Sequence, residues 1–220
     1  MNLKFHYFQT SIGQKLLVAI TGLGLIGFLL GHVSGNLLIF AGPEAINAYA
    51  EGLRAFPGLL WIARIGLIGM FVLHMFLAIR LNLKNKAARN EPYRFKATVK
   101  ASFASKTMVH TGILTLLYVL YHLAHFTFRS VGGVEQYGPY DVYAMVVESF
   151  QNPVTALLYI LSMVVLGLHL SHGIASVFQT MGLTNKAYRP QILKIGPAVA
   201  WAISLLYISI PLAVLFGLVK

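Results

Sequence analysis

Long apolar stretches recur five times along this chain, and short polar segments separate them. A helix needs about 20 mostly apolar residues to cross the hydrocarbon core of a bilayer, and each stretch meets that length. We therefore expect an all-α membrane protein in which residues 1–220 form a single domain, a five-transmembrane-helix bundle. The expected helices cover about residues 15–40, 59–82, 106–129, 154–179 and 195–218.

Prolines and one amphipathic segment refine this pattern. Pro57, Pro153 and Pro197 lie at or near expected helix starts, where a missing N–H costs little, and Pro211 should kink the last helix. The first stretch has no convincing cleavage site, so we expect a retained helix and not a signal peptide. In Glu44–Phe56, apolar residues recur at helical spacing, which predicts a helix lying on the membrane surface.

The composition supports a membrane protein and limits its chemistry. The chain is 57% hydrophobic and only 10% charged, whereas soluble domains carry roughly 25% charged residues. It contains no cysteine, which excludes cysteine-ligated iron–sulfur clusters, disulfides and covalently attached haem within this chain. A bound metal would therefore depend on histidine, methionine, tyrosine or carboxylate ligands.

The net charge of +11 is distributed unevenly and predicts the orientation in the membrane. Five of the six acidic residues fall on the side opposite to most basic residues, and only Glu91 shares the basic side. The positive-inside rule then places the N-terminus in the cytoplasm and the C-terminus outside. We expect a basic face for a soluble partner and no nucleic acid. Thirteen of the 17 basic residues lie on the cytoplasmic side: Lys4, Lys15, Arg80, Lys84, Lys86, Arg89, Arg94, Lys96, Lys100, Lys106, Lys186, Arg189 and Lys194.

Seven of the eight histidines fall inside apolar stretches, and six of them lie well within the membrane, where ionisable side chains are rare and usually functional. At a rise of 1.5 Å per residue, His32 in the first helix lies ~26 Å from the inner end. In the third helix His122 and His125 lie at ~24 Å and ~28 Å. These three rings share an outer level. His6 and His110 lie in the tail and at the inner interface, and we expect no special role for them.

The other intramembrane histidines share an inner level. His74 in the second helix lies ~9 Å from the inner end, and His169 and His172 in the fourth lie at ~17 Å and ~12 Å. Two histidine pairs at two depths, each drawn from different helices, are what two b-type haems require. Zinc or copper would need ligands clustered at one depth. Small residues beside these histidines fit either a flat macrocycle or close helix packing: Gly24, Gly27, Gly31, Gly35, Gly66, Gly69, Gly167 and Gly173.

Several short motifs together resemble the cytochrome b subunit of succinate dehydrogenases and quinol:fumarate reductases, in the single-chain, dihaem, five-helix form called the b558 family. They span nearly the whole chain. In order they are Ser11-Ile-Gly-Gln-Lys15, Gly31-His-Val-Ser-Gly-Asn36, Arg64-Ile-Gly-Leu67, Ala78-Ile-Arg-Leu81, Ser105-Lys-Thr-Met108, Tyr121-His-Leu123 and His169-Leu-Ser-His-Gly173.

The resemblance implies two b haems with bis-histidine axial ligation. His32 with His122 would bind the outer haem, and His74 with His169 the inner one. The context of each motif selects His122 over His125 and His169 over His172, which remain the alternates. Some relatives carry a glutamate for transmembrane proton transfer two residues before the fourth-helix ligand, where this chain has Gly167. The resemblance therefore gives no support for that proton route here.

The resemblance also implies the function of a membrane anchor in respiratory complex II of a bacterial cytoplasmic (inner) membrane. Electrons would pass between a cytoplasmic iron–sulfur subunit and a quinone, with menaquinone expected. Dicarboxylate chemistry of the tricarboxylic acid cycle would belong to a flavoprotein subunit, so this quinone-reactive chain would supply no catalytic residue. The sequence does not distinguish succinate oxidation from fumarate reduction. Four basic residues are candidates for binding the inner-haem propionates, the partner or lipid headgroups: Lys15, Arg80, Lys106 and Arg189. The sequence does not place the quinone site, and the outer helix ends near Asn36, Glu44 and Glu51 are candidates by position only.

Two alternatives stay open at this point. One is a dihaem cytochrome b anchor of another respiratory dehydrogenase, of the hydrogenase or formate dehydrogenase type. The other is a transporter or channel in which histidines relay protons. Against the transporter, the sequence shows no inverted repeat and no paired broken helices.

Overall fold

The computed structural model describes residues 8–88 and 102–220. Within these ranges the fold consists of seven α-helices with one short 3-10 helix and one short π-helix, and it contains no strand. Five of the helices are long and apolar enough to cross a membrane. The expected all-α bundle of five spans is therefore confirmed for the described part of the chain. Some residues that we considered lie outside it, namely Lys4, His6, Arg89, Glu91, Arg94, Lys96 and Lys100.

The spanning helices follow the apolar stretches closely. Helix α2 runs over Ser11–Asn36 and continues as the 3-10 helix η1 over Leu37–Ala41. Helix α5 runs over Phe103–His122 and continues as the π-helix η2 over Leu123–Thr127. The other three are α4 over Pro57–Ala87, α7 over Pro153–Thr180 and α8 over Arg189–Leu215.

The start of the last helix differs from the expectation. Helix α8 begins at Arg189, so Pro197 lies inside the helix and not at its start. Pro190 occupies the first turn instead, where its fixed φ suits the helix and no N–H is needed. The polar residues that the pattern assigned to a connection are therefore the first helical turn of α8.

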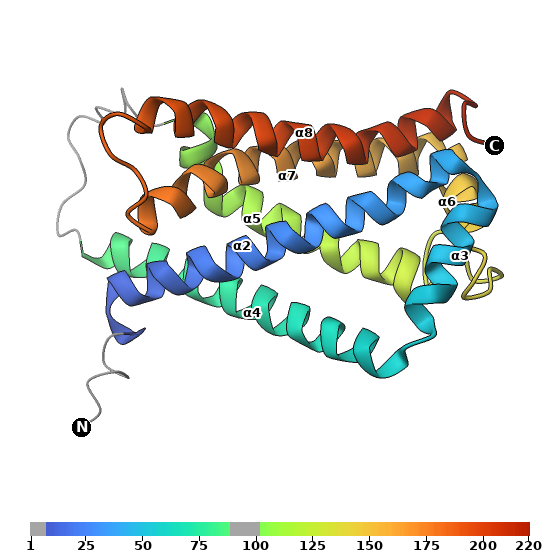
Figure 1. The fold of residues 1–220 in the computed structure, drawn as a ribbon, viewed down its shortest axis with the longest axis horizontal. Helices are drawn as coiled ribbons and strands as arrows, with labels where there is room; N and C mark the ends of the chain where they lie inside the picture. Colours follow the sequence, from blue (N-terminus) through green and yellow to red (C-terminus); the bar gives the residue numbers. More distant parts are fainter. Residues whose placement is uncertain (1–7, 89–101) are drawn as a thin grey trace.

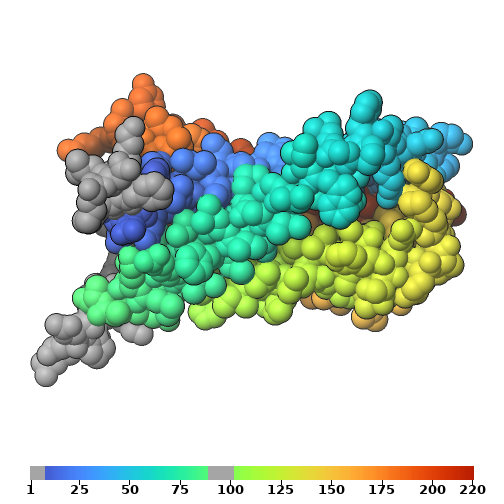
Figure 2. Space-filling model, turned by 90° about the horizontal axis from the view of Figure 1, so that it is seen from below, coloured from blue at the N-terminus to red at the C-terminus, as the bar shows by residue number. Residues whose placement is uncertain are grey.

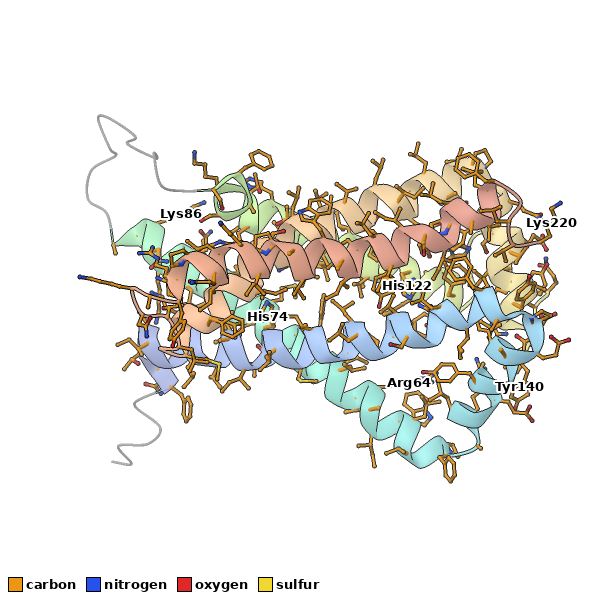
Figure 3. The ribbon with its side chains drawn as sticks, turned by 45° about the horizontal axis from the view of Figure 1, so that its top comes forward. Arg64, His74, Lys86, His122, Tyr140 and Lys220 are labelled. Carbon is orange, nitrogen blue, oxygen red and sulfur yellow. The ribbon has the colours of Figure 1, made fainter. Side chains whose placement is uncertain are left out.

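The five long helices lie side by side along the long axis of the molecule (Figure 1). Helix α2 packs against α4, α5 packs against α7, and α8 lies along α7 and also contacts α2. We call the end that carries Lys86 the inner end and the end that carries Lys220 the outer end (Figure 3). The helical pairs α2–α4 and α5–α7 meet mainly where α2 contacts α7, and α8 packs on α7.

Helix α4 separates from the bundle towards the outer end. Its buried residues are Leu77 and Leu81, both in its inner half, and in Figure 1 its outer half diverges from α2. Figure 2 shows a hollow between α4 and α5 in this region. Helices α2, α4 and α5 therefore border an open wedge in the outer half of the bundle.

Two short helices cover the outer end. Helix α3 runs over Pro43–Arg54, which confirms the helix expected within Glu44–Phe56, and α6 runs over Val142–Gln151. The side-chain oxygen of Asn47 accepts a hydrogen bond from the backbone N–H of Tyr143 at 3.0 Å and so links the two helices. The outer end is therefore closed by a packed helical layer.

Candidate functional site

The outer histidine pair joins helices α2 and α5. The ring centroids of His32 and His122 lie 6.0 Å apart, with their planes at 82°. A metal–imidazole bond is about 2 Å long, and a ring nitrogen lies about 1 Å from its centroid, so two axial imidazoles place their centroids about 6 Å apart. The Nδ1 atom of His122 is buried and has no hydrogen-bond partner among the residues that the structure describes. The pair therefore has the spacing and an uncommitted nitrogen that suit axial ligation.

Aromatic rings surround this pair and keep water away from it. Phe28 stacks on His32 at 5.2 Å between centroids, and Tyr207 of α8 lies 6.1 Å from the same ring. On the other side Tyr118 and Phe126 each lie 5.7 Å from His122. The environment of the two imidazoles is thus apolar, which raises the strength of electrostatic interactions within it.

His125 lies in a different environment from His122, although only three residues separate them. It is completely buried, at 0% exposure. Its Nδ1 lies 2.9 Å from the hydroxyl of Tyr159, and its Nε2 lies 3.2 Å from the hydroxyl of Ser149. Both ring nitrogens are therefore occupied, and the π-turn of η2 places this ring towards α6 and α7. This geometry makes His125 a structural residue.

The inner histidines are held in two similar settings. The Nδ1 of His74 on α4 lies 3.1 Å from both the hydroxyl of Thr21 and the carbonyl oxygen of Val18, which belong to α2. The Nδ1 of His169 on α7 lies 3.3 Å from the hydroxyl of Thr111 on α5. In both rings Nδ1 is engaged, which leaves Nε2 for another ligand.

The spacing of these contacts along α2 and α5 is the same. Thr21 precedes His32 by 11 residues, and Thr111 precedes His122 by 11 residues. Eleven residues make about three helical turns, so each threonine and histidine share one face of their helix, about 16 Å apart along the axis. Figure 3 shows His74 in the inner half of the bundle and His122 in the outer half. The same 11-residue interval on α2 and α5 therefore places a threonine at the inner level and a histidine at the outer level.

Glycines on α2 divide into two groups. A Cβ atom on Gly24 would lie 2.8 Å from Met70 Sδ on α4, and one on Gly35 would clash with the ring of Tyr49 on α3. Gly27 and Gly31 lie on the same helical face, but a Cβ on either would meet nothing within 4 Å. They therefore face the open wedge, and Gly31 leaves room directly beside His32.

Other glycines reflect helix packing and not room for a ligand. A Cβ on Gly167 would lie 2.9 Å from the hydroxyl oxygen of Ser204 and 3.1 Å from the ring of Trp201 on α8. A Cβ on Gly173 would make ordinary contact with Met108, at 3.8 Å. Position 167 is thus closed by α8, and a glutamate side chain has no space there.

Three arginines line one pocket at the outer end, a feature that the sequence analysis did not single out. Arg54, Arg64 and Arg129 share this pocket with Phe126, which contacts His122. Burial and the positive charges of Arg129 and Arg64 lower the pKa of Arg54. The ring of Tyr140 lies 5.5 Å from the Arg54 guanidinium. Such a pocket can hold an anionic group next to the outer histidine pair.

The remaining candidates lie apart from the two pairs. His172 is partly exposed, and its Nε2 lies 3.0 Å from the hydroxyl of Ser176 on the same helix. His110 is exposed. Within residues 8–88 and 102–220, no group of three or more histidine or acidic side chains is arranged to hold a metal ion alone. The basic residues Lys15, Arg80, Lys106 and Arg189 are exposed, as are Glu44 and Glu51, while Asn36 is partly buried.

Thr21 and Thr111 are the residues of this site that sequence reasoning missed. The signal was present, because a Thr-Gly step precedes a histidine by the same interval in the first and third apolar stretches. A single threonine in an apolar helix ordinarily bonds its own backbone, so the step attracts no attention without its partner.

In comparisons with protein-family models, curated proteins and solved structures, nothing matches this chain.

Proposed function

We propose that this chain is the dihaem cytochrome b membrane anchor of a succinate:quinone oxidoreductase. His32 and His122 would hold the outer haem, and His74 and His169 the inner one. The observation that carries this proposal is the outer pair His32–His122, whose ring centroids lie 6.0 Å apart. The inner histidines, His74 and His169, support it because each has its Nδ1 held by a neighbouring helix, which leaves Nε2 for a ligand. The motifs that resemble the b558 family supply the choice of enzyme class.

The residues present fit two flat, bis-histidine-ligated groups. The ring centroids of the outer pair lie 6.0 Å apart, and His122 has an unpartnered nitrogen among the described residues, so His32 and His122 would hold the outer group. The open faces of Gly27 and Gly31 give room beside it. At the outer end, the pocket of Arg54, Arg64 and Arg129 offers positive charge for carboxylate groups. At the inner end, Lys15, Arg80, Lys106 and Arg189 are candidates for the corresponding carboxylates or for the partner subunit.

The haems, when bound, would supply one-electron chemistry between the iron–sulfur subunit and a quinone. This chain would ligate iron through its histidine rings, orient those rings through neighbouring hydroxyls and exclude water with Phe28, Tyr118 and Phe126. Its basic inner end would face the cytoplasm and contact the iron–sulfur and flavoprotein subunits, in a bacterial inner membrane. The closed position of Gly167 agrees with an enzyme that lacks the glutamate-dependent proton route.

The first test is haem content and its dependence on the four histidines. The purified protein should give a reduced b-type spectrum with two haems per chain. His74→Ala or His169→Ala should remove the inner haem, and His32→Ala or His122→Ala the outer haem. His110→Ala is the matched control, because this exposed ring lies on the same helix as His122.

The same preparations separate this proposal from its competitors. A chain purified without haem, or a complete two-haem spectrum after His169→Ala, would refute the ligand assignment. Co-purification of a covalently flavinylated subunit with an iron–sulfur subunit would support the succinate:quinone class. Co-purification of a hydrogenase or formate dehydrogenase subunit would be compatible with the histidine ligand assignment but would reject the succinate:quinone oxidoreductase class.

A further inference from the structure

A threonine followed by a glycine faces each inner histidine from the neighbouring helix. Thr21 and Gly22 of α2 face His74 of α4, and Thr111 and Gly112 of α5 face His169 of α7. A Cβ on Gly22 would lie 3.1 Å from Cε1 of His74, and one on Gly112 would lie 3.3 Å from Cε1 of His169. In both settings the hydroxyl meets Nδ1 while the glycine lets the ring approach the helix backbone.

The hydrogen bonds of the first setting fix which nitrogen carries the proton. The carbonyl oxygen of Val18 can only accept a hydrogen bond, so Nδ1 of His74 must donate to it. The hydroxyl of Thr21 donates to the carbonyl of Leu17 at 2.7 Å and can accept from the same Nδ1. A neutral ring that is protonated on Nδ1 has its lone pair on Nε2, which is the form that binds a metal.

The second setting follows the same logic. The hydroxyl of Thr111 lies within donating distance of the carbonyls of Thr107 and Met108, at 3.2 Å and 3.1 Å. Its oxygen is therefore free to accept from Nδ1 of His169. The outer level lacks this device, because Nδ1 of His122 has no partner.

We infer that Thr21 and Thr111 are positioning residues that hold His74 and His169 with Nδ1 protonated and Nε2 presented to the inner haem. This inference rests on the two-haem function proposed above. Residues that accept a hydrogen bond from the outer nitrogen of a ligating histidine fix its tautomer and orientation and raise its basicity. The repeated Thr-Gly step is then a local recognition element for an inner-haem ligand.

The inference has a redox consequence that packing alone does not produce. A hydrogen-bond acceptor at Nδ1–H makes the imidazole a stronger electron donor, which stabilises ferric over ferrous iron. Removal of the hydroxyl should therefore raise the midpoint potential of the inner haem. The outer haem, whose ligands contact neither threonine, should keep its potential.

The experiment is a potentiometric titration of the full-length protein with both haems bound. The inner-haem step is identified as the one that His74→Ala removes. Thr21→Val and Thr111→Val should each shift this step to higher potential and change its low-spin ferric EPR signal, and the double variant should shift it further. The shift in potential caused by Thr21→Val should be partial, because the carbonyl of Val18 still accepts a hydrogen bond from Nδ1 of His74.

Two controls separate the hydroxyl from general packing. Thr21→Ser and Thr111→Ser retain the hydroxyl and should restore the wild-type potential and signal. Thr115→Val lies one turn beyond Thr111, and its hydroxyl bonds only the backbone of its own helix, to Thr111 O at 2.8 Å, so it should change neither step.

The outcomes distinguish this inference from the function on which it rests. Wild-type protein that binds two haems, with both steps unchanged in the double valine variant, overturns the positioning role alone, as does an equal shift of both steps. If valine removes the inner haem, recovery by serine supports the role of the hydroxyl, and failure of serine to restore it overturns that role. Wild-type protein without two haems overturns the proposed function itself.

Discussion

At the residue scale, His122 and His125 illustrate how neighbouring histidines acquire different roles. Their placement within one helical turn gives them nearly the same depth, so depth cannot separate them. The hydroxyls of Tyr159 and Ser149 occupy both nitrogens of His125, whereas Nδ1 of His122 is unpartnered. Hydrogen-bond accounting thus favours His122 as the ligand.

This difference predicts opposite results for two substitutions. His125→Ala should lower the free energy of unfolding by about 2–4 kcal/mol, because it leaves a cavity and an unpaired hydroxyl on Tyr159. It should nevertheless retain both haems. His122→Ala should remove the outer haem. Thermal denaturation and haem quantification on the same preparations measure both effects.

His172→Ala serves as the control for these variants, because its ring is partly exposed and bonds only to Ser176 of its own helix. Its effect on stability should stay within about 0.5 kcal/mol. Loss of the outer haem in His125→Ala, with retention in His122→Ala, would reverse the two assignments.

At the element scale, α4 and α5 are the two spans with the smallest buried share within the described residues. Only its inner half has buried residues, and a Cβ on Gly66 would meet nothing within 4 Å. Gly66 lies one turn from Met70, which contacts Gly24 of α2, so Gly66 also faces α2. The outer half of α4 therefore has open space beside Gly66, towards the wedge.

A bulky residue on this face should interfere with the outer haem. Gly66→Leu is expected to lower outer-haem occupancy while inner-haem occupancy and membrane insertion stay unchanged, since a Cβ at this position meets no described atom within 4 Å. Haem content by absorption, with the two haems separated by potential, gives the measurement. Gly58→Leu is the matched control, because it lies at the start of the same helix and also meets nothing within 4 Å.

Full occupancy of both haems in Gly66→Leu would show that the wedge is not the place where the outer group lies. Equal loss of both haems would instead indicate a general defect of α4. Only selective loss of the outer haem supports the proposed use of the wedge.

At the scale of the whole molecule, the two ends of the bundle differ in composition. The inner end carries exposed lysines such as Lys86, Lys106 and Lys186, whereas the outer end is covered by α3 and α6. An odd number of spans places the described ends of the chain at opposite ends of the bundle (Figure 1). The charge asymmetry then predicts that the inner end faces the cytoplasm.

Because the chain has no cysteine, single cysteines can report this orientation without background. Lys186→Cys should react with a membrane-impermeant maleimide only after the cells are opened. Glu148→Cys, on exposed α6, should react in intact cells. The reverse pattern would contradict the orientation, and reaction of both from outside would contradict the arrangement of the spans.

The sequence by itself determined the number and approximate positions of the spans and the two depths of the histidines. Hydrophobicity over about 20 residues is a local property, and helical rise converts residue number directly into depth. It misplaced the start of α8, because a polar first turn resembles a connection. The sequence also showed the small residues along α2, but it did not separate the glycines that pack against another helix, such as Gly35, from those that face open space, such as Gly31.

The tertiary structure decided which histidine nitrogens are occupied and by what. The contacts of His74 with Thr21, and of His125 with Tyr159, join residues 53 and 34 positions apart. Their existence depends on how separate helices rotate and approach one another, which no local pattern encodes. The splayed outer half of α4 and the arginine pocket also arise from packing between helices. The sequence thus gives the type and depth of each side chain, while the tertiary structure decides which hydrogen-bond partner each histidine nitrogen has.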